Sequence, residues 1–221
     1  MDSPGAAPSW SARPPILYTA VVIPGLILAA GRSERMGRPK ALLSCGPAGE
    51  TFVRRLATTL AAGGVNGVVV VGRSGDAALQ AEIGGLPVAA RFVENADADA
   101  GQLSSLLAGL AAVDRPGVVA LLVTPVDAPL IEPTTVAALL ASLRSTGAPI
   151  VRATYQGRHG HPVIFGRAVF DDLRQADSSL GARGVVRAYG AGVVNVAVND
   201  PAVLGDVDTP DDYRALGGPE L

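Results

Sequence analysis

The chain contains 221 residues, of which 48% are apolar and 17% are charged, and its net charge is −2. This length suits one α/β domain with a single core. The lack of a basic excess argues against a nucleic-acid-binding surface. Cys45 is the only cysteine, which excludes an internal disulfide and fits a reducing compartment, so we expect a cytoplasmic protein.

The first thirty residues fall into two segments. Residues 1–14 are rich in Pro, Ser, Ala and Gly, which predicts a disordered leader ahead of one domain over residues 15–221. Residues 15–30 are apolar, but Pro24 interrupts the run and only Arg13 precedes it as a positive flank. The run is also shorter than the roughly 20 residues of a spanning helix. We therefore expect a buried strand that leads into a loop, and no membrane segment.

Short β-branched runs alternate with amphipathic stretches along the rest of the chain. The predicted strands are residues 21–29, 67–72, 88–93, 118–123, 149–154, 162–165 and 192–198. The predicted helices are residues 50–62, 75–83, 102–113, 133–145, 167–175, 181–189 and 209–216. Glycines at 63–64, 84–85 and 147 are typical helix stops. This alternation predicts a three-layer, Rossmann-like α/β fold with a mostly parallel sheet.

The segment 155–165 breaks the alternation. Residues 155–160 are typical of a turn between two strands with no helix between them. We therefore expect one antiparallel strand in the sheet. Because ligands bind at the carboxyl ends of strands in such sheets, the motifs that follow strands are the candidate sites.

The first strand leads into residues 29–40, Ala-Ala-Gly-Arg-Ser-Glu-Arg-Met-Gly-Arg-Pro-Lys. Small residues let the backbone approach a ligand, and two glycines permit a loop whose amides face an anion. Arg35 and Lys40 add cationic side chains, and Lys40 is the only lysine of the chain. The loop matches neither the Walker A pattern nor the dinucleotide fingerprint, which argues against a dehydrogenase. It predicts a triphosphate site, and the alternative is a surface turn with solvated charges.

Two aspartate motifs are candidates for binding a cation. Asp127 follows the strand 118–123 and lies between two prolines, which leave it little conformational freedom. Its carboxylate suits a hard cation, although an aspartate at such a place also serves as a turn residue or helix cap. Asp206 and Asp208 are separated by one residue and point the same way on an extended segment. The alternative for that segment is a simple helix start, capped by Thr209.

Two further motifs are less specific. Residues 101–106, Gly-Gln-Leu-Ser-Ser-Leu, open a predicted helix, and helix N-termini attract anions. Ser104 and Ser105 are equally suited to be ordinary residues of a first helical turn. His161 lies in the segment Gly-His-Pro-Val at 160–163, and a lone histidine near a turn is more often structural than catalytic.

The segment 28–43 resembles the signature loop of the MobA-like nucleotidyltransferases and is most similar to that of the molybdenum cofactor cytidylyltransferases. The similarity extends from about residue 21 to residue 216, with four motifs in the expected order. Ala-Ala-Gly at 29–31 and Gly-His-Pro-Val at 160–163 resemble the cytidylyl branch of the family. Thr124-Pro125 is a departure, since many relatives have a small residue nearby.

The resemblance implies a fold of the nucleotide-diphospho-sugar transferase type and a role for each motif. It implies that Lys40, Arg35 and Asp127 are catalytic, that Asp127 and Asp208 hold Mg²⁺ with Asp206 as a near neighbour, and that His161 serves the acceptor side. The nucleotide-binding residues that it implies are Leu28, Ala29, Ala30, Gly31, Arg32, Arg35, Lys40, Gly101, Ser104 and Ser105.

The activity implied by the resemblance is transfer of a nucleoside monophosphate to a phosphorylated acceptor, with release of pyrophosphate. The leading expectation is CTP as donor and molybdopterin as acceptor, with transient contact to a molybdoenzyme or a cofactor-insertion protein. One alternative keeps the chemistry and replaces the acceptor by a sugar phosphate or alcohol phosphate. Another is a non-catalytic nucleotide-binding or cofactor-delivery protein. Neither a nucleic acid nor a membrane is an expected partner.

Overall fold

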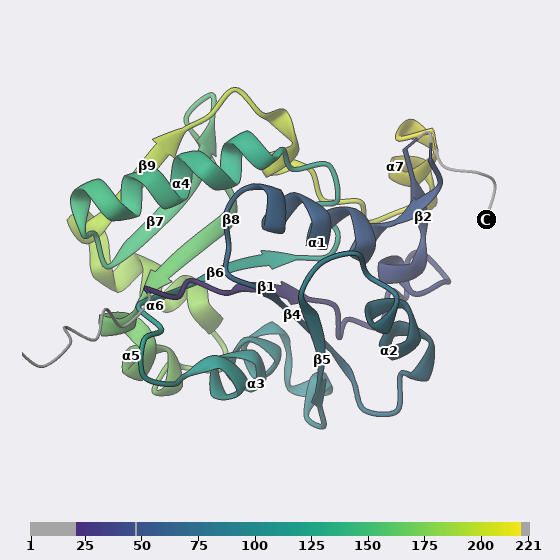
Figure 1. Ribbon diagram of the computed structural model, residues 1–221, viewed down its shortest axis with the longest axis horizontal. Coiled ribbons are helices and arrows are strands. Elements are labelled where there is room, and N and C mark those ends of the chain that lie inside the picture. Colours follow the sequence, from purple (N-terminus) through teal and green to yellow (C-terminus); the bar gives the residue numbers. More distant parts are fainter. Residues whose placement is uncertain (1–20, 47, 218–221) are drawn as a thin grey trace, which may run out of the picture.

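Seven strands form the central sheet of the computed structural model, which describes residues 21–46 and 48–217. The strand order is β5-β4-β1-β6-β8-β7-β9 (Figure 1). Only β8 runs antiparallel to its neighbours, and the other pairs are parallel. This arrangement confirms the predicted α/β fold with a mostly parallel sheet and one antiparallel strand. The strands are β1 (Gly25–Leu28), β4 (Val68–Arg73), β5 (Ala90–Asn95), β6 (Ala120–Pro125), β7 (Ile150–Tyr155), β8 (Arg158–Gly166) and β9 (Val193–Ala197).

Helices cover both faces of this sheet (Figure 1). On one face pack α1 (Phe52–Ala62), α2 (Ala77–Gly84) and α4 (Pro133–Thr146), and on the other α3 (Gln102–Val113), α5 (Phe170–Arg174) and α6 (Gly181–Tyr189). Each face of the sheet packs against its helices in a separate hydrophobic core. Because successive side chains of a strand point to opposite faces, Ile27 lies in the first core and Leu26 in the second. The last helix, α7 (Pro210–Ala215), contributes Tyr213 to the first core.

Most predicted elements are found within a few residues of their expected bounds, with two corrections. The helix predicted from residue 50 begins at Phe52, because Glu50–Thr51 (β3) pairs with Ser44–Cys45 (β2) in a small separate sheet. The predicted turn at 155–160 is shorter than expected. Gln156 and Gly157 both have positive φ, as a two-residue hairpin turn requires, and β8 starts directly after them.

Helix ends follow the expected chemistry. Thr51 caps α1 by accepting a hydrogen bond from the Arg54 amide, and Asp76 caps α2 in the same way through Leu79. Gly147 ends α4 in the left-handed conformation that glycine favours. Short 3-10 helices occur at Lys40–Leu42 (η1), Ala98–Ala100 (η2), Arg167–Val169 (η3), Gly190–Gly192 (η4) and Pro201–Leu204 (η5).

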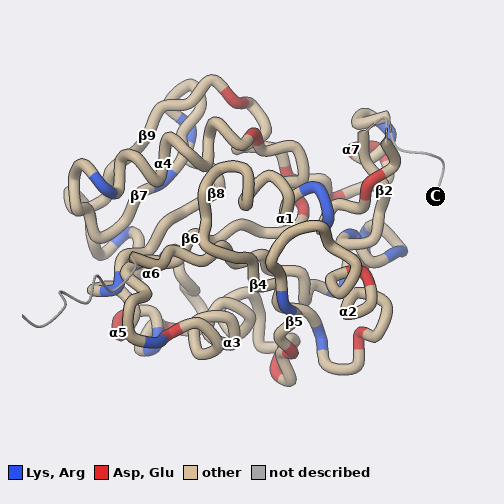
Figure 2. Tube along the Cα trace, viewed as in Figure 1, with Lys and Arg blue, Asp and Glu red and all other residues tan. Residues whose placement is uncertain are grey.

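The strand predicted over residues 21–29 is realised as β1, preceded by an isolated bridge between Val22 and Val118. The predicted leader at 1–14 lies outside the described residues. Within 21–46 and 48–217, no helix has both the length and the apolar character needed to cross a bilayer. Positive and negative residues are interspersed along the traced chain (Figure 2), in keeping with the net charge of −2.

Candidate active site

The loop after β1 folds back on itself so that its last residue returns toward the sheet. The Ala29 amide donates to the Val71 carbonyl at 2.8 Å, which fixes the start of the loop beside β4. Met36, only 3% exposed, anchors its middle in the core. The Lys40 amide then donates to the Ser33 hydroxyl at 3.2 Å, across seven residues. The loop therefore presents Lys40 at the start of η1, next to the carboxyl end of β1.

Two backbone hydrogen bonds place Asp127 beside this loop and beside the C-terminal segment. The Val126 amide donates to the Leu28 carbonyl at 3.0 Å, which joins the end of β6 to the end of β1. The Val207 amide donates to the Asp127 carbonyl at 2.8 Å. Segments separated by 80 or more positions in the chain thus meet at one edge of the sheet, as its parallel topology favours.

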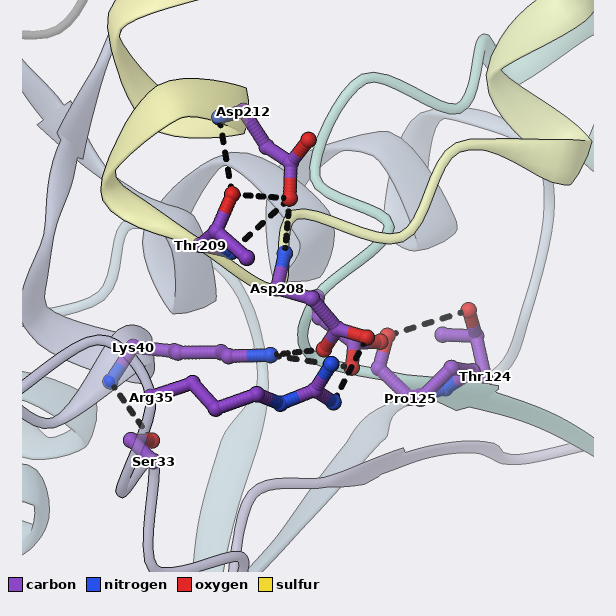
Figure 3. A network of polar contacts seen from close by, with 9 residues as sticks. Ser33, Arg35, Lys40, Thr124, Pro125, Asp208, Thr209 and Asp212 are labelled. Atoms are coloured by element: carbon purple, nitrogen blue, oxygen red, sulfur yellow. Dashed lines mark hydrogen bonds and ion pairs between the residues drawn. The ribbon is translucent and has the colours of Figure 1, made fainter.

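Lys40, Arg35, Asp127 and Asp208 form one charged cluster. Figure 3 shows Lys40 and Arg35 reaching toward Asp208. The Lys40 Nζ lies 2.5 Å from Asp208 Oδ1 and 3.5 Å from Asp127 Oδ2. The Arg35 Nη2 lies 2.8 Å from Asp208 Oδ2. Lys40 is the more enclosed cation, with 11% of its side chain exposed against 69% for Arg35. The cluster therefore pairs two cations from the loop with two carboxylates from other segments.

The two carboxylates differ in electrostatic environment. Burial raises the pKa of Asp127 above its ordinary value, although the Lys40 ammonium acts in the opposite direction. The pKa of Asp208 is lowered, mainly by its hydrogen bond with Lys40. One oxygen of Asp127, Oδ1, is buried and has no hydrogen-bond partner among the described residues. Burial of an oxygen without a hydrogen-bond partner costs free energy unless a ligand or water contacts it. Asp127 is therefore suited to bind a ligand that enters the site.

The segment that carries Asp208 is held by the start of α7. Thr209 and Asp212 form a capping box, and Asp212 Oδ2 also accepts a hydrogen bond from the Asp208 amide at 3.1 Å. Figure 3 shows Thr209 and Asp212 on one side of Asp208 and the loop cations on the other. The helix-cap alternative is thus realised by Thr209 and Asp212. Asp208 pairs with the loop cations, and its assignment as a metal ligand stays a prediction. Asp206 is exposed, and its pKa is raised by desolvation and by the negative charge of Asp208.

A cavity of about 740 Å³ opens over this cluster, at the carboxyl ends of β1, β4 and β6. Its volume is in the range of small-molecule sites. Most of the residues that the sequence predicts for the site line it, namely Leu28, Ala29, Ala30, Gly31, Arg32, Arg35, Lys40, Gly101, Ser105, Asp127 and Asp208. The geometry thus brings together the predicted loop, the predicted carboxylates and the start of α3.

Two predicted site residues do not line this cavity. The Ser104 hydroxyl donates to the carbonyls of Asp97 and Gly101 and accepts from the Asn95 side chain, so its hydrogen bonds hold the turn before α3. His161 is not among the residues that line the cavity, but it lies near enough to Asp127 for that carboxylate to act on the pKa of the imidazole. Burial lowers the pKa of His161, and its Nδ1 has no partner within the described part of the chain. Its assignment to the acceptor side stays a prediction.

Sequence reasoning missed a second ion-pair group at the cavity, formed by Arg32, Arg73 and Asp99. Arg32 contacts Asp99 with two hydrogen bonds of 2.9 and 2.6 Å, and Arg73 contacts it at 2.8 Å. Arg73 also donates to the Ala30 carbonyl at 3.2 Å. The two arginines lower the pKa of Asp99 to about 2, with Arg32 the larger cause. The position of Arg73 at the carboxyl end of β4 is the signal that would have identified it.

The residues at the site fit a divalent cation. Asp127 and Asp208 offer hard oxygen ligands of the kind that Mg²⁺ and Mn²⁺ prefer, and the buried Asp127 Oδ1 lacks a partner. No group of three or more His, Cys, Asp or Glu side chains with metal-binding geometry occurs in residues 21–46 and 48–217. Two carboxylates are nevertheless enough for Mg²⁺ when substrate phosphates and water complete its coordination.

The sequence matches one protein family and several curated relatives. Residues 25–193 match the model of the MobA-like NTP transferase domain. The molybdenum cofactor guanylyltransferase of Sinorhizobium fredii is 32% identical over 210 residues, which cover 89% of this chain and 87% of that protein. The bifunctional IPC transferase and DIPP synthase of Rubrobacter xylanophilus is 46% identical over 90 residues, but the match spans only 20% of its length.

Solved structures show the same fold. Rv0371c of Mycobacterium tuberculosis H37Rv superimposes with a TM-score of 0.72 at 30% identity, over 89% of this chain and 97% of that one. A second crystal structure of Rv0371c is a complex with manganese, and it superimposes with a TM-score of 0.68 at 27% identity.

Proposed function

Because the chain belongs to the family of proteins with a MobA-like NTP transferase domain, we propose that it transfers a nucleoside monophosphate from an NTP to a phosphorylated acceptor and releases pyrophosphate. We propose CTP as the donor, molybdopterin as the acceptor and Mg²⁺ as the cofactor. The observation that carries the proposal is the convergence of Lys40, Asp127 and Asp208 on one cavity.

Two kinds of observation support the choice of substrates. The name of the Sinorhizobium fredii relative, a molybdenum cofactor guanylyltransferase, supports an acceptor from molybdenum cofactor synthesis. The choice of CTP rests on Ala-Ala-Gly at 29–31 and Gly-His-Pro-Val at 160–163, which resemble the cytidylyl branch of the family. We further propose that the protein acts in the cytoplasm, where Cys45 stays reduced, and that it contacts a molybdoenzyme or a cofactor-insertion protein transiently.

In the proposed reaction, the protein positions the two substrates and stabilises the negative charge that develops on the phosphates. A phosphate oxygen of the acceptor is already ionised at neutral pH, so its attack on the α-phosphorus needs no general base. The bond to the pyrophosphate breaks as the new phosphoanhydride bond forms. In this proposal Lys40 and Arg35, which line the cavity, stabilise the charge that builds on the leaving pyrophosphate. Gly31 and Ala30 let the backbone approach the nucleotide closely.

Asp127 and Asp208 would hold the Mg²⁺ ion in this scheme. When bound, the ion supplies charge neutralisation at the phosphates. The two aspartates contribute a fixed pair of oxygen ligands, since the Val207–Asp127 backbone bond ties their segments together.

The test is pyrophosphate release in Mg²⁺ with each of the four NTPs, with and without molybdopterin. The proposal expects release only with CTP and molybdopterin together. If CTP releases pyrophosphate with a sugar phosphate or alcohol phosphate instead, the proposed acceptor is wrong but the proposed reaction, nucleotidyl transfer, still holds. Nucleotide binding with no release under any of these conditions would contradict the proposal and favour a binding or delivery protein.

A further inference from the structure

Lys40 occupies the space between the two carboxylates that are proposed to bind metal. Its Nζ lies 2.5 Å from Asp208 Oδ1 and 3.5 Å from Asp127 Oδ2. It comes from a loop whose return is fixed by the Ser33–Lys40 hydrogen bond. Only 11% of its side chain is exposed, so bulk water screens this ammonium little. One positive charge therefore already lies between the two carboxylates and offsets part of their negative charge.

A divalent cation bound to the same carboxylates would lie within a few ångströms of this ammonium. Two positive charges at such a distance repel strongly in a partly enclosed site, where the effective dielectric constant is far below that of water. To form contacts with both carboxylates, the cation has to displace Lys40 or accept the repulsion. Either requirement weakens its binding.

A nucleoside triphosphate changes this balance. Its phosphates bring several negative charges into the cavity lined by Lys40 and Arg35, and a lysine ammonium is a good partner for them. Lys40 can then pair with phosphate oxygens, which leaves Asp127 and Asp208 free to bind a cation. The same phosphates also offer that cation further oxygen ligands.

We propose that Lys40 holds the place of the divalent cation in the nucleotide-free protein, so that metal binds tightly only once a triphosphate has drawn Lys40 away. The inference rests on the proposed function, because it takes Asp127 and Asp208 as the metal-binding pair. It gives Lys40 a second role, in which it makes metal binding depend on nucleotide. The free protein is thereby kept from binding divalent cations in an unproductive complex.

Arg35 does not fill the same role. It contacts Asp208 Oδ2 at 2.8 Å, has no contact with Asp127 within the described residues, and keeps 69% of its side chain exposed. A cation that is mostly solvated is easily displaced and well screened. Lys40 is therefore the residue whose removal should change metal affinity most.

The experiment measures Mn²⁺ binding to the nucleotide-free protein by electron paramagnetic resonance, which reports free Mn²⁺ directly. Lys40→Met keeps most of the side-chain length and removes the charge, and Lys40→Gln is a second variant in case the first folds poorly. Arg38→Met is the matched control, since Arg38 lies two residues away in the same loop and is exposed. Lys40→Met combined with Asp127→Asn tests where the ion binds.

We expect Lys40→Met and Lys40→Gln to bind Mn²⁺ at least about tenfold more tightly than the wild type, and Arg38→Met to match the wild type. The gain should disappear in the double variant. Equal affinity of the wild type and both Lys40 variants would overturn the inference, whether they all bind Mn²⁺ or none does. A gain that persists with Asp127→Asn would instead contradict the proposed metal site, and with it the proposed function of Asp127.

Discussion

Hydrogen bonds hold the backbone of Asp127 in place, but one oxygen of its side chain has no hydrogen-bond partner among the described residues. Its carbonyl accepts the Val207 amide, and the neighbouring Val126 amide donates to Leu28. Its Oδ1 is buried without a partner, and burial raises its pKa. A carboxylate that is desolvated in this way disfavours folding relative to a neutral group. This electrostatic environment is consistent with the role proposed for Asp127, the binding of a cation.

We expect Asp127→Asn to lower nucleotidyl transfer by at least about 10²–10³-fold, by analogy with the loss of a single charge-stabilising contact. The melting temperature should be equal to that of the wild type or higher, because the amide removes a desolvated charge. Pyrophosphate release and a thermal melt on the same preparation check both parts. Normal turnover in Mg²⁺ would refute the assignment of Asp127.

Asp99 shows the opposite electrostatic behaviour, because two arginines stabilise its charged form. Its pKa is lowered to about 2, so its ion pairs favour the folded state at all pH values above the ordinary pKa of an aspartate. As the pH falls below the ordinary aspartate pKa, the unfolded chain is protonated first and this contribution shrinks, and it is lost once the pH falls through the folded-state pKa and the carboxylate is protonated in both states.

Urea unfolding of the wild type and of Asp99→Asn measures this contribution. We expect the wild type to be the more stable by a small, pH-independent margin above about pH 5, and the margin to shrink between about pH 4 and pH 2. The margin should be small because Asp99 is exposed. A margin that stays constant down to pH 2 would show that it does not come from the ion pairs of Asp99, and no margin at any pH would show that these pairs do not stabilise the fold.

Among the elements, α7 matters to the site although it is only six residues long. Its capping box is built by Thr209 and Asp212, and the same Asp212 oxygen receives the Asp208 amide. The start of this helix therefore fixes the backbone from which the Asp208 side chain reaches Lys40. The cap of α7 and the proposed metal ligand Asp208 therefore share one hydrogen-bond network.

Asp212→Ala removes this network, and Asp211→Ala is its matched control. Asp211 is the neighbouring residue, and within residues 21–46 and 48–217 its side chain has a polar contact with the exposed Arg214 and with no other residue. We expect Asp212→Ala to lower the free energy of unfolding by about 1 kcal/mol, as lost helix caps do, and to reduce kcat/KM several-fold. Asp211→Ala should leave both nearly unchanged. Equal kcat/KM values for the two variants would show that α7 does not position Asp208.

At the scale of the whole molecule, the sequence predicted the parts of the site that follow from strand order. Parallel strands place their carboxyl ends at one edge, so the loop after β1 and Asp127 after β6 were expected to meet. Asp208 reaches the same edge from the far end of the chain, and that prediction rested on the family resemblance. The antiparallel β8 was predicted from the turn residues at 155–160.

Other features depend on contacts between distant segments and leave little local signal. The pairing of Arg32 with Asp99 joins residues 67 positions apart. The strand β3 occupies Glu50 and Thr51, the first two residues of the predicted helix 50–62, because Thr51 serves as a cap and not as a first helical residue. Ser104 was predicted to face the nucleotide from its place in a motif, but its hydroxyl points to the turn that precedes α3.

The central claim is that the loop cations, Asp127 and Asp208 act on one bound triphosphate with a divalent ion between them. The measurement that tests it most directly is a crystal structure with a non-hydrolysable CTP analogue and Mn²⁺, in which anomalous scattering locates the ion. The account predicts an anomalous peak in contact with both the Asp127 and Asp208 carboxylates, with the Lys40 ammonium on the triphosphate. A peak away from these carboxylates, or a nucleotide bound outside the cavity, would contradict it.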